Sequence, residues 1–366
     1  MARQSHAVDG RLAPDGAGEE APGERAAANG AQGVRKTVNL ALQGGGAHGA
    51  FAWGVLDSLL QDGRIDIEGI SATSAGAMNA VVLAHGYECG GREGARRALA
   101  GFWARVAHAA RAFPLRPSLS AGFGCNGGFG EMFPAVDLFL RLFSPYQFNP
   151  VNFNPLRAIL EECVDFERLR NSTRIRLFLS ATNVRTAKVR VFQNAEISAA
   201  AVLASACLPT VFQAVEIEGE AYWDGGYMGN PAIFPLIYNC RSRDVVVVHL
   251  NCLTRPDVPK TATEIINRSN EISFNSSLMR EMRAIDFITR LIDEGKITDP
   301  SVKRMLIHTI DAEGFMPSLA VNSKLNADWE FLTQLKMLGQ MKSEGWIAGN
   351  FEALSLKSTA DFSLYL

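Results

Sequence analysis

Two successive strand–turn–helix patterns near the start of the chain constrain the fold most. Residues 37–43 (TVNLALQ) form the apolar run of a buried strand, and a glycine-rich turn follows at 44–49. Residues 50–63 then carry apolar side chains at helical spacing and end at a glycine. The same order returns with a strand pattern at 65–71, a serine turn, and a helix pattern at 77–87. This repetition predicts parallel strands covered by helices, so we expect an α/β fold.

Later segments extend the same pattern. We expect strands at 174–183 and 188–194, and a helix of small residues at 196–208. The run DVVVVHLN at 244–251 is apolar throughout, as in a strand that is covered on both faces. Residues 261–345 have a helical pattern throughout. The chain therefore predicts a mainly parallel central sheet and a helical C-terminal extension.

The first 35 residues differ from the rest. They are rich in Ala, Gly, Glu and Arg and lack aromatic residues, which predicts a disordered tail. The net charge of −2 over 366 residues lacks the basic footprint of nucleic-acid binding. Neither a secretory signal nor an apolar run of membrane-spanning length is visible, so we expect a cytoplasmic protein.

The glycine turn has two functional interpretations. Gly44, Gly46 and Gly49 match G-x-G-x-x-G, the phosphate loop of dinucleotide-binding proteins. That site also needs an acidic residue at the end of the next strand, where this chain has SATSAG instead. Alternatively, glycine N–H groups at a helix start can stabilise an oxyanion. A tight turn without a ligand is the third reading, and the loop alone does not decide among them.

The serine turn has the pattern of a nucleophile elbow. Ala72-Thr73-Ser74-Ala75-Gly76 resembles G-x-S-x-G with alanine in place of the first glycine. The alternative is a serine that caps the following helix. Asp224, followed by two glycines, could supply the base, although Asp-Gly is also common in hairpin turns.

Taken together, GGGAHG, SATSAGA and DGG stand in an order that closely resembles the patatin-like phospholipase family. The stretches SATNVRTAKVRVFQN, AVLASACLPTVFQAVEIEGEAYWDGGYMGNPAI and SPYQFNPVNFNPLRAILEE are also similar to that family, so the resemblance covers roughly residues 37–250. It implies a three-layer α/β/α fold. The expected organisation is a tail at 1–35, a catalytic domain at 36–255 and a helical region at 256–366 packed on that domain.

The resemblance further implies a serine acyl hydrolase with a Ser–Asp dyad. Ser74 would be the nucleophile and Asp224 its base. The oxyanion hole would come from the glycine loop and the residue after the nucleophile, namely Gly44, Gly45, Gly46, Gly49 and Ala75. Two positions depart from the family pattern: Ala72 replaces a glycine, and His48 stands where many members have Arg or Lys. These departures leave open a catalytically silent member of the family that acts through binding.

A Ser–Asp–His triad is the alternative mechanism. His249 and His308 follow Ser74 and Asp224 in the chain order that α/β-hydrolases use. The resemblance favours the dyad.

The segment 112–154 is the sequence clue to the substrate. Its aromatic residues interleave with Gly and Pro, which indicates either a flap that contacts lipid or an insertion that covers the core. We expect fatty-acyl esters of phospholipids or lysophospholipids as substrates, and peripheral membrane contact through this segment. The C-terminal helices could form a homodimer interface. No cofactor and no metal are expected, because a serine nucleophile needs neither.

Overall fold

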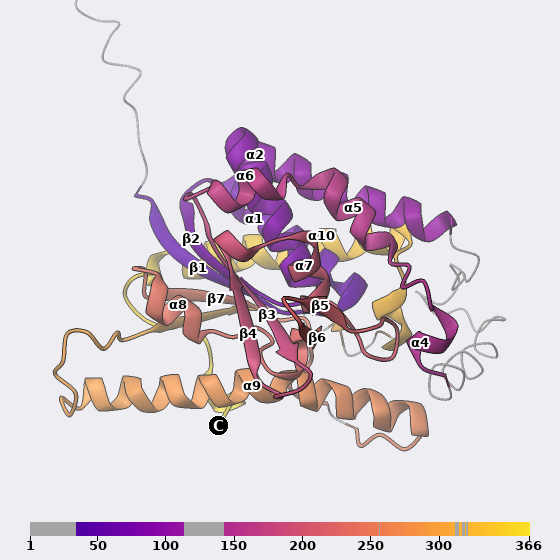
Figure 1. Ribbon diagram of the computed structural model, residues 1–366. Helices are drawn as coiled ribbons and strands as arrows, with labels where there is room; N and C mark the ends of the chain where they lie inside the picture. The colour runs from indigo at the N-terminus through magenta and orange to yellow at the C-terminus, as the bar shows by residue number, and fades with distance from the viewer. Residues whose placement is uncertain (1–33, 113–142, 256, 312–314, 317–318, 320) are drawn as a thin grey trace, which may run out of the picture. The chain divides into compact units, whose positions relative to one another are not determined.

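The computed structural model describes residues 34–366 except 113–142, 256, 312–314, 317–318 and 320, and Arg35–Leu366 form one compact unit (Figure 1). Nearly all of the expected tail and most of the 112–154 segment therefore lie outside the described residues.

A mixed, mostly parallel sheet forms the centre of the unit. Its strand order is β5-β6-β3-β2-β1-β7-β8, with β4 paired to β3. The β1–β2, β2–β3, β1–β7 and β7–β8 pairs are parallel, whereas β3–β4, β3–β6 and β5–β6 are antiparallel. The strands are β1 (Lys36–Leu42), β2 (Ile65–Ala72), β3 (Arg176–Asn183), β4 (Val189–Gln193), β5 (Val215–Ile217), β6 (Glu220–Asp224), β7 (Asp244–Val248) and β8 (Leu306–Ile310).

Helices cover both faces of this sheet. The α-helices are α1 (Gly49–Asp62), α2 (Ala75–Ala112), α4 (Pro145–Phe148), α5 (Pro155–Cys163), α6 (Phe166–Asn171), α7 (Ala199–Ser205), α8 (Phe234–Asn239), α9 (Ala262–Asp293) and α10 (Trp329–Asn350). Short 3-10 turns that matter below are η1 (Gly46–His48), η4 (Gly225–Tyr227) and η6 (Val321–Leu325). In Figure 1, α1, α2 and α10 lie on one side of the sheet, and α8 and α9 on the other.

The core follows this layering. In β1, Leu40 and Leu42 belong to the apolar cluster under α1, α2 and α10, whereas Ala41 belongs to the cluster under α8 and α9. In β7, Val246 and Val247 alternate in the same way. Alternation along a strand sends successive side chains to opposite faces, so both faces of the sheet are buried. The expected three-layer α/β/α architecture is confirmed.

Two glycines let α1 and α10 cross with their backbones in contact. A Cβ atom at Gly54 would lie 1.9 Å from the carbonyl oxygen of Lys336, and one at Gly339 would lie 2.1 Å from that of Phe51. The first helix of the unit is therefore packed directly on its last long helix.

The C-terminal region differs from the expectation of helix throughout 261–345. It contains α9 and α10, but β8 lies between them and extends the sheet beyond β7. His308 in β8 contacts Asp244 in β7, with 3.0 Å between Nε2 and Oδ1. The region thus contributes a strand to the central layer as well as helices to the outer ones.

Within the described part of the chain, no helix combines the length and apolar composition needed to cross a bilayer. Over the same residues, no three His, Cys, Asp or Glu side chains gather as a possible metal site.

Candidate active site

The three motifs that the sequence singles out meet at one place. The glycine loop follows β1, the serine turn follows β2, and Asp224 ends β6. A Cβ atom at Gly44 would lie 2.6 Å from Cβ of Ser74, and one at Gly49 would lie 2.7 Å from Cβ of Ala75. On the other side, a Cβ atom at Gly225 would lie 3.0 Å from Cγ2 of Thr73. Glycine at these positions is what allows the three segments to touch.

Ser74 occupies a strained turn between β2 and α2. Its φ of 56° lies in the left-handed region, which non-glycine residues rarely adopt. Its backbone N–H donates to Oγ of Ser205 at 2.9 Å, and its side chain is partly exposed. Two residues on, a Cβ atom at Gly76 would lie 2.5 Å from the carbonyl oxygen of Leu42. The turn therefore combines a left-handed, partly exposed serine with neighbours that must stay small.

Asp224 is buried and fixed by its backbone. Its N–H donates to the carbonyl oxygen of Cys207 at 2.8 Å, and its carbonyl oxygen accepts from Thr182 Oγ1 at 2.8 Å. Its carboxylate accepts the N–H of Gly226 at 2.7 Å and interacts with the Ser74 side chain. The Asp-Gly sequence is thus not a hairpin turn here, because η4 follows it and leads on toward α8.

Burial determines the titration of Asp224. Loss of hydration raises the pKa of this carboxyl to about 7, against the opposing effects of the Gly226 N–H, the Ser74 side chain and the charge of Lys324. A carboxylate with such a pKa can exchange a proton near neutral pH.

Several backbone amides of the glycine loop and of the serine turn have no acceptor among the described residues. The N–H groups of Gly45, Gly46 and Ala75 donate no hydrogen bond to any other described residue. Gly46 and Ala75 begin η1 and α2, and the first N–H groups of a helix have no partner within it. The N–H groups of Gly44 and Gly49 are already used, by Asn230 Oδ1 at 2.7 Å and by carbonyls of η1.

Side-chain amides fix the glycine loop, and the sequence analysis did not identify them. Gln43 is buried; its Oε1 accepts the N–H groups of Leu250 at 2.9 Å and Asn251 at 3.0 Å, and its Nε2 donates to the carbonyl oxygen of Asn230 at 3.2 Å. Asn251 Nδ2 donates to the carbonyl oxygen of Gly44 at 2.9 Å. The stretch DGGYMGN, which resembles the family, could have suggested Asn230, whereas Gln43 and Asn251 had no local signal.

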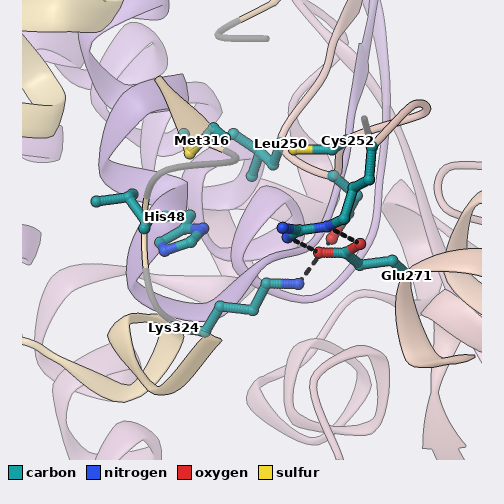
Figure 2. A pocket seen from close by; sticks show the side chains of 9 residues that line it. His48, Leu250, Cys252, Glu271, Met316 and Lys324 are labelled. Carbon is teal, nitrogen blue, oxygen red and sulfur yellow. Dashed lines mark hydrogen bonds and ion pairs between the residues drawn. The ribbon is translucent and has the colours of Figure 1, made fainter. Parts of the chain in front are cut away.

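A pocket opens beside the glycine loop (Figure 2). In the figure, His48 lines one side, and Lys324 of η6 reaches across toward Glu271 of α9. Lys324 Nζ donates to Asn251 Oδ1 at 2.8 Å. Burial, together with the nearby Lys324 charge, lowers the pKa of His48 to about 3, so His48 is neutral. Its Nε2 lies 2.7 Å from Oγ of Ser323.

Neither histidine of the alternative triad bonds to Ser74 or Asp224 among the described residues. His249 Nε2 lies 2.7 Å from the hydroxyl of Tyr365. His308 lies between Asp244 and Thr359. Both rings hold the C-terminal part of the chain against the sheet.

The α/β/α fold thus brings a serine turn, a buried carboxylate and a glycine loop together at one place. A family model described as patatin-like phospholipase matches residues 40–237, more than half of the chain. The chain therefore belongs to the patatin-like phospholipase family, which places it among lipid acyl hydrolases.

Two further comparisons accompany this assignment. No curated protein matches the chain. Among solved structures, VipD from Legionella pneumophila is similar with 16% sequence identity and a TM-score of 0.33. The alignment covers 82% of this chain and 66% of the VipD chain, slightly under two thirds. The family assignment rests on the family model.

Proposed function

We propose that the protein hydrolyses fatty-acyl esters of phospholipids or lysophospholipids through a Ser74–Asp224 dyad. The observation that carries the proposal is the contact between Ser74 on its strained turn and Asp224, whose carboxyl has a pKa of about 7. General bases work best when their pKa lies near the operating pH.

The reaction would proceed in two steps. Asp224 takes the hydroxyl proton while Ser74 Oγ attacks the ester carbonyl carbon, and the carbonyl oxygen becomes an oxyanion. The N–H groups of Gly45, Gly46 and Ala75 would stabilise that oxyanion, while Gly44 and Gly49 allow the close packing around it. Collapse of the intermediate releases the alcohol, which takes the proton from Asp224. Water then gives a proton to Asp224 and attacks the acyl-enzyme, and the fatty acid leaves Ser74 as the hydroxyl is restored.

The aromatic segment supports a lipid substrate. Its described part exposes Phe143, Tyr146 and Phe153 by 44%, 59% and 57%. We propose that residues 112–154 contact the acyl chain or a membrane surface. A cytoplasmic location and a homodimer remain predictions.

Fatty-acid release from a panel of phospholipids and lysophospholipids tests the function. We expect Ser74→Ala and Asp224→Asn to lose activity by on the order of 10⁴-fold, because the nucleophile or its base is gone. We expect kcat/KM of the wild type to rise with pH through about 7, as Asp224 ionises. Labelling of Ser74 by a fluorophosphonate would separate the hydrolase from a dinucleotide-binding protein, which does not react.

Two controls complete this experiment. Ser301→Ala removes an exposed hydroxyl far along the chain from the site and should keep full activity. His249→Ala should keep activity if it remains folded, whereas a triad would lose it. Activity that survives Ser74→Ala would overturn the proposal.

A further inference from the structure

Both ends of the Gly44 residue are held by side-chain amides. Its N–H donates to Asn230 Oδ1 at 2.7 Å, and its carbonyl oxygen accepts from Asn251 Nδ2 at 2.9 Å. The carbonyl of Gly44 and the N–H of Gly45 belong to one planar peptide group and point in opposite directions in the trans form. A side chain that holds the Gly44 carbonyl therefore also determines where the Gly45 N–H points.

Asn251 is in turn held by a lysine from the C-terminal part of the chain. Lys324 Nζ donates to Asn251 Oδ1 at 2.8 Å, although the two residues are 73 positions apart. An ammonium on the amide oxygen polarises the group and strengthens its N–H as a donor. The second contact of Asn251 Nδ2, with Gln43 Oε1 at 3.4 Å, is longer.

The segment around Lys324 also contacts the glycine loop directly. A Cβ atom at Gly46 would lie 2.3 Å from the carbonyl oxygen of Lys324. The neighbouring Ser323 bonds to His48, the last residue of η1. The η6 turn thus meets the loop at Gly46 and His48 and reaches it through Asn251.

We propose that Lys324 is a positioning residue that aims the Gly45 N–H through Asn251 and the Gly44 carbonyl. The proposal rests on the proposed acyl hydrolysis, because it assigns the Gly45 amide to the oxyanion. It makes two residues outside the matched family region, Asn251 and Lys324, part of the site.

Lys324 has a second, electrostatic effect. Its charge lowers the pKa of Asp224, although burial raises that pKa more. Burial lowers the pKa of Lys324 itself, whereas the Glu271 carboxylate, the Cys252 thiol and Asp224 raise it and the Arg255 guanidinium lowers it. The neutral ring of His48 also faces Lys324. Removal of the ammonium should therefore raise the pKa of Asp224 as well as release Asn251.

Lys324→Met tests the proposal, because it keeps the apolar stem and removes the ammonium. We expect kcat to fall by on the order of 10-fold to 10²-fold with little change in KM, since the loss of one whole oxyanion donor lowers kcat by about 10²–10³. The acidic limb of the pH profile of kcat/KM should move to higher pH, and Lys324→Arg should restore part of kcat.

Lys336→Met is the matched control, since Lys336 is also partly buried but its Nζ lies 3.8 Å from the Asp57 carboxylate on α1. A folded Lys324→Met protein with wild-type kcat and pH profile would overturn the proposal.

Asn251→Asp provides a second variant if Lys324→Met does not fold. A carboxylate can still accept from Lys324 but cannot donate to the Gly44 carbonyl. We expect the same loss of kcat even though the lysine is present. Unchanged kcat in this variant would exclude the relay through Asn251.

A measurement without turnover separates this proposal from the proposed function. Amide hydrogen exchange of a peptide that covers residues 40–52 should be faster in Lys324→Met than in wild type or Lys336→Met. If the wild-type protein does not hydrolyse lipids, the proposed function is refuted, but amide exchange can still be compared among the three proteins. Equal exchange in all three proteins would refute the positioning role.

Discussion

Asp224 occupies a position that disfavours its own charge. It is 1% exposed, and the polar groups around its carboxylate offset only part of the lost hydration, so its pKa stays near 7. Ser74 is also held in an unfavourable state, because its left-handed backbone conformation is strained. Both residues are held in unfavourable states by the packing of three loops, which is typical of functional sites rather than of structural ones.

The raised pKa of Asp224 predicts a pH-dependent loss of stability. The folded state binds this proton more tightly than the unfolded state, where the pKa is near 3.8. The stabilisation is therefore present below pH 4 and is lost as pH rises through about 7. Asp224→Asn should not lose stability in this way, because an amide does not titrate. Relative to wild type, we expect it to gain about 2–4 kcal/mol in free energy of unfolding between pH 4 and pH 8, at about 1.4 kcal/mol per pKa unit.

Urea denaturation at both pH values measures this difference. The Glu281 carboxyl on α9, whose pKa is also raised to about 7 by burial, titrates in both proteins and cancels in the comparison because Asp224 is not among the groups that shift it. Ser74→Ala is a second variant of the proposed dyad that keeps the carboxylate, so we expect it to retain the loss of stability with rising pH. If the free energy of unfolding changes with pH in the same way in Asp224→Asn and in wild type, the raised pKa of Asp224 is contradicted.

At the scale of elements, the sequence predicted the strands and helices whose formation depends on the local pattern of residues. β1, α1, β2, β3 and β7 lie close to their expected ranges because each has a clear apolar pattern and a turn signal at its end. β8 was missed, since a five-residue apolar stretch between two long helices becomes a strand only by pairing with β7. Lys324 was missed for the same reason, because its contact with Asn251 exists only in the folded chain.

The crossing of α1 and α10 makes a testable prediction. Gly339→Ala places a methyl group 2.1 Å from the carbonyl oxygen of Phe51, so the two helices must move apart. We expect a loss of about 1–3 kcal/mol in free energy of unfolding, despite the higher helix propensity of alanine. Gly345→Ala in the same helix meets nothing within 4 Å and should gain up to about 1 kcal/mol. Chemical denaturation of both variants measures the contrast, and equal effects would exclude backbone contact at this crossing.

At the scale of the whole molecule, the order of strands differs from the order of the chain. β1 lies between β2 and β7, and β8 covers the far edge of β7. Lys36 at the start of β1 donates to the carbonyl oxygens of Phe351 and Leu354 near the end of the chain. Residues 256–366 thus complete the sheet with β8 and add α9 to one helical layer and α10 to the other.

A chain that ends at residue 255 tests whether the expected catalytic domain is independent. Without β8, α9 and α10, the edge of β7 and the α10-facing side of α1 would meet water. We expect this fragment to be insoluble or to lack cooperative unfolding, whereas residues 35–366 should unfold cooperatively. Circular dichroism and gel filtration of both proteins provide the measurement. A soluble, cooperatively unfolding fragment would show that the boundary at 255 separates independent domains.

The contact between α1 and α10 also sets the timing of folding during synthesis. Asp57 of α1 accepts a hydrogen bond from Gln340 of α10, which is made 283 residues later in the chain. At about 5–20 residues per second, the ribosome needs on the order of 15–60 s to make that partner. During this interval the nascent chain presents the apolar side of its first helix without its final cover. Exposed apolar surface of this kind favours aggregation until α10 has been made and covers it.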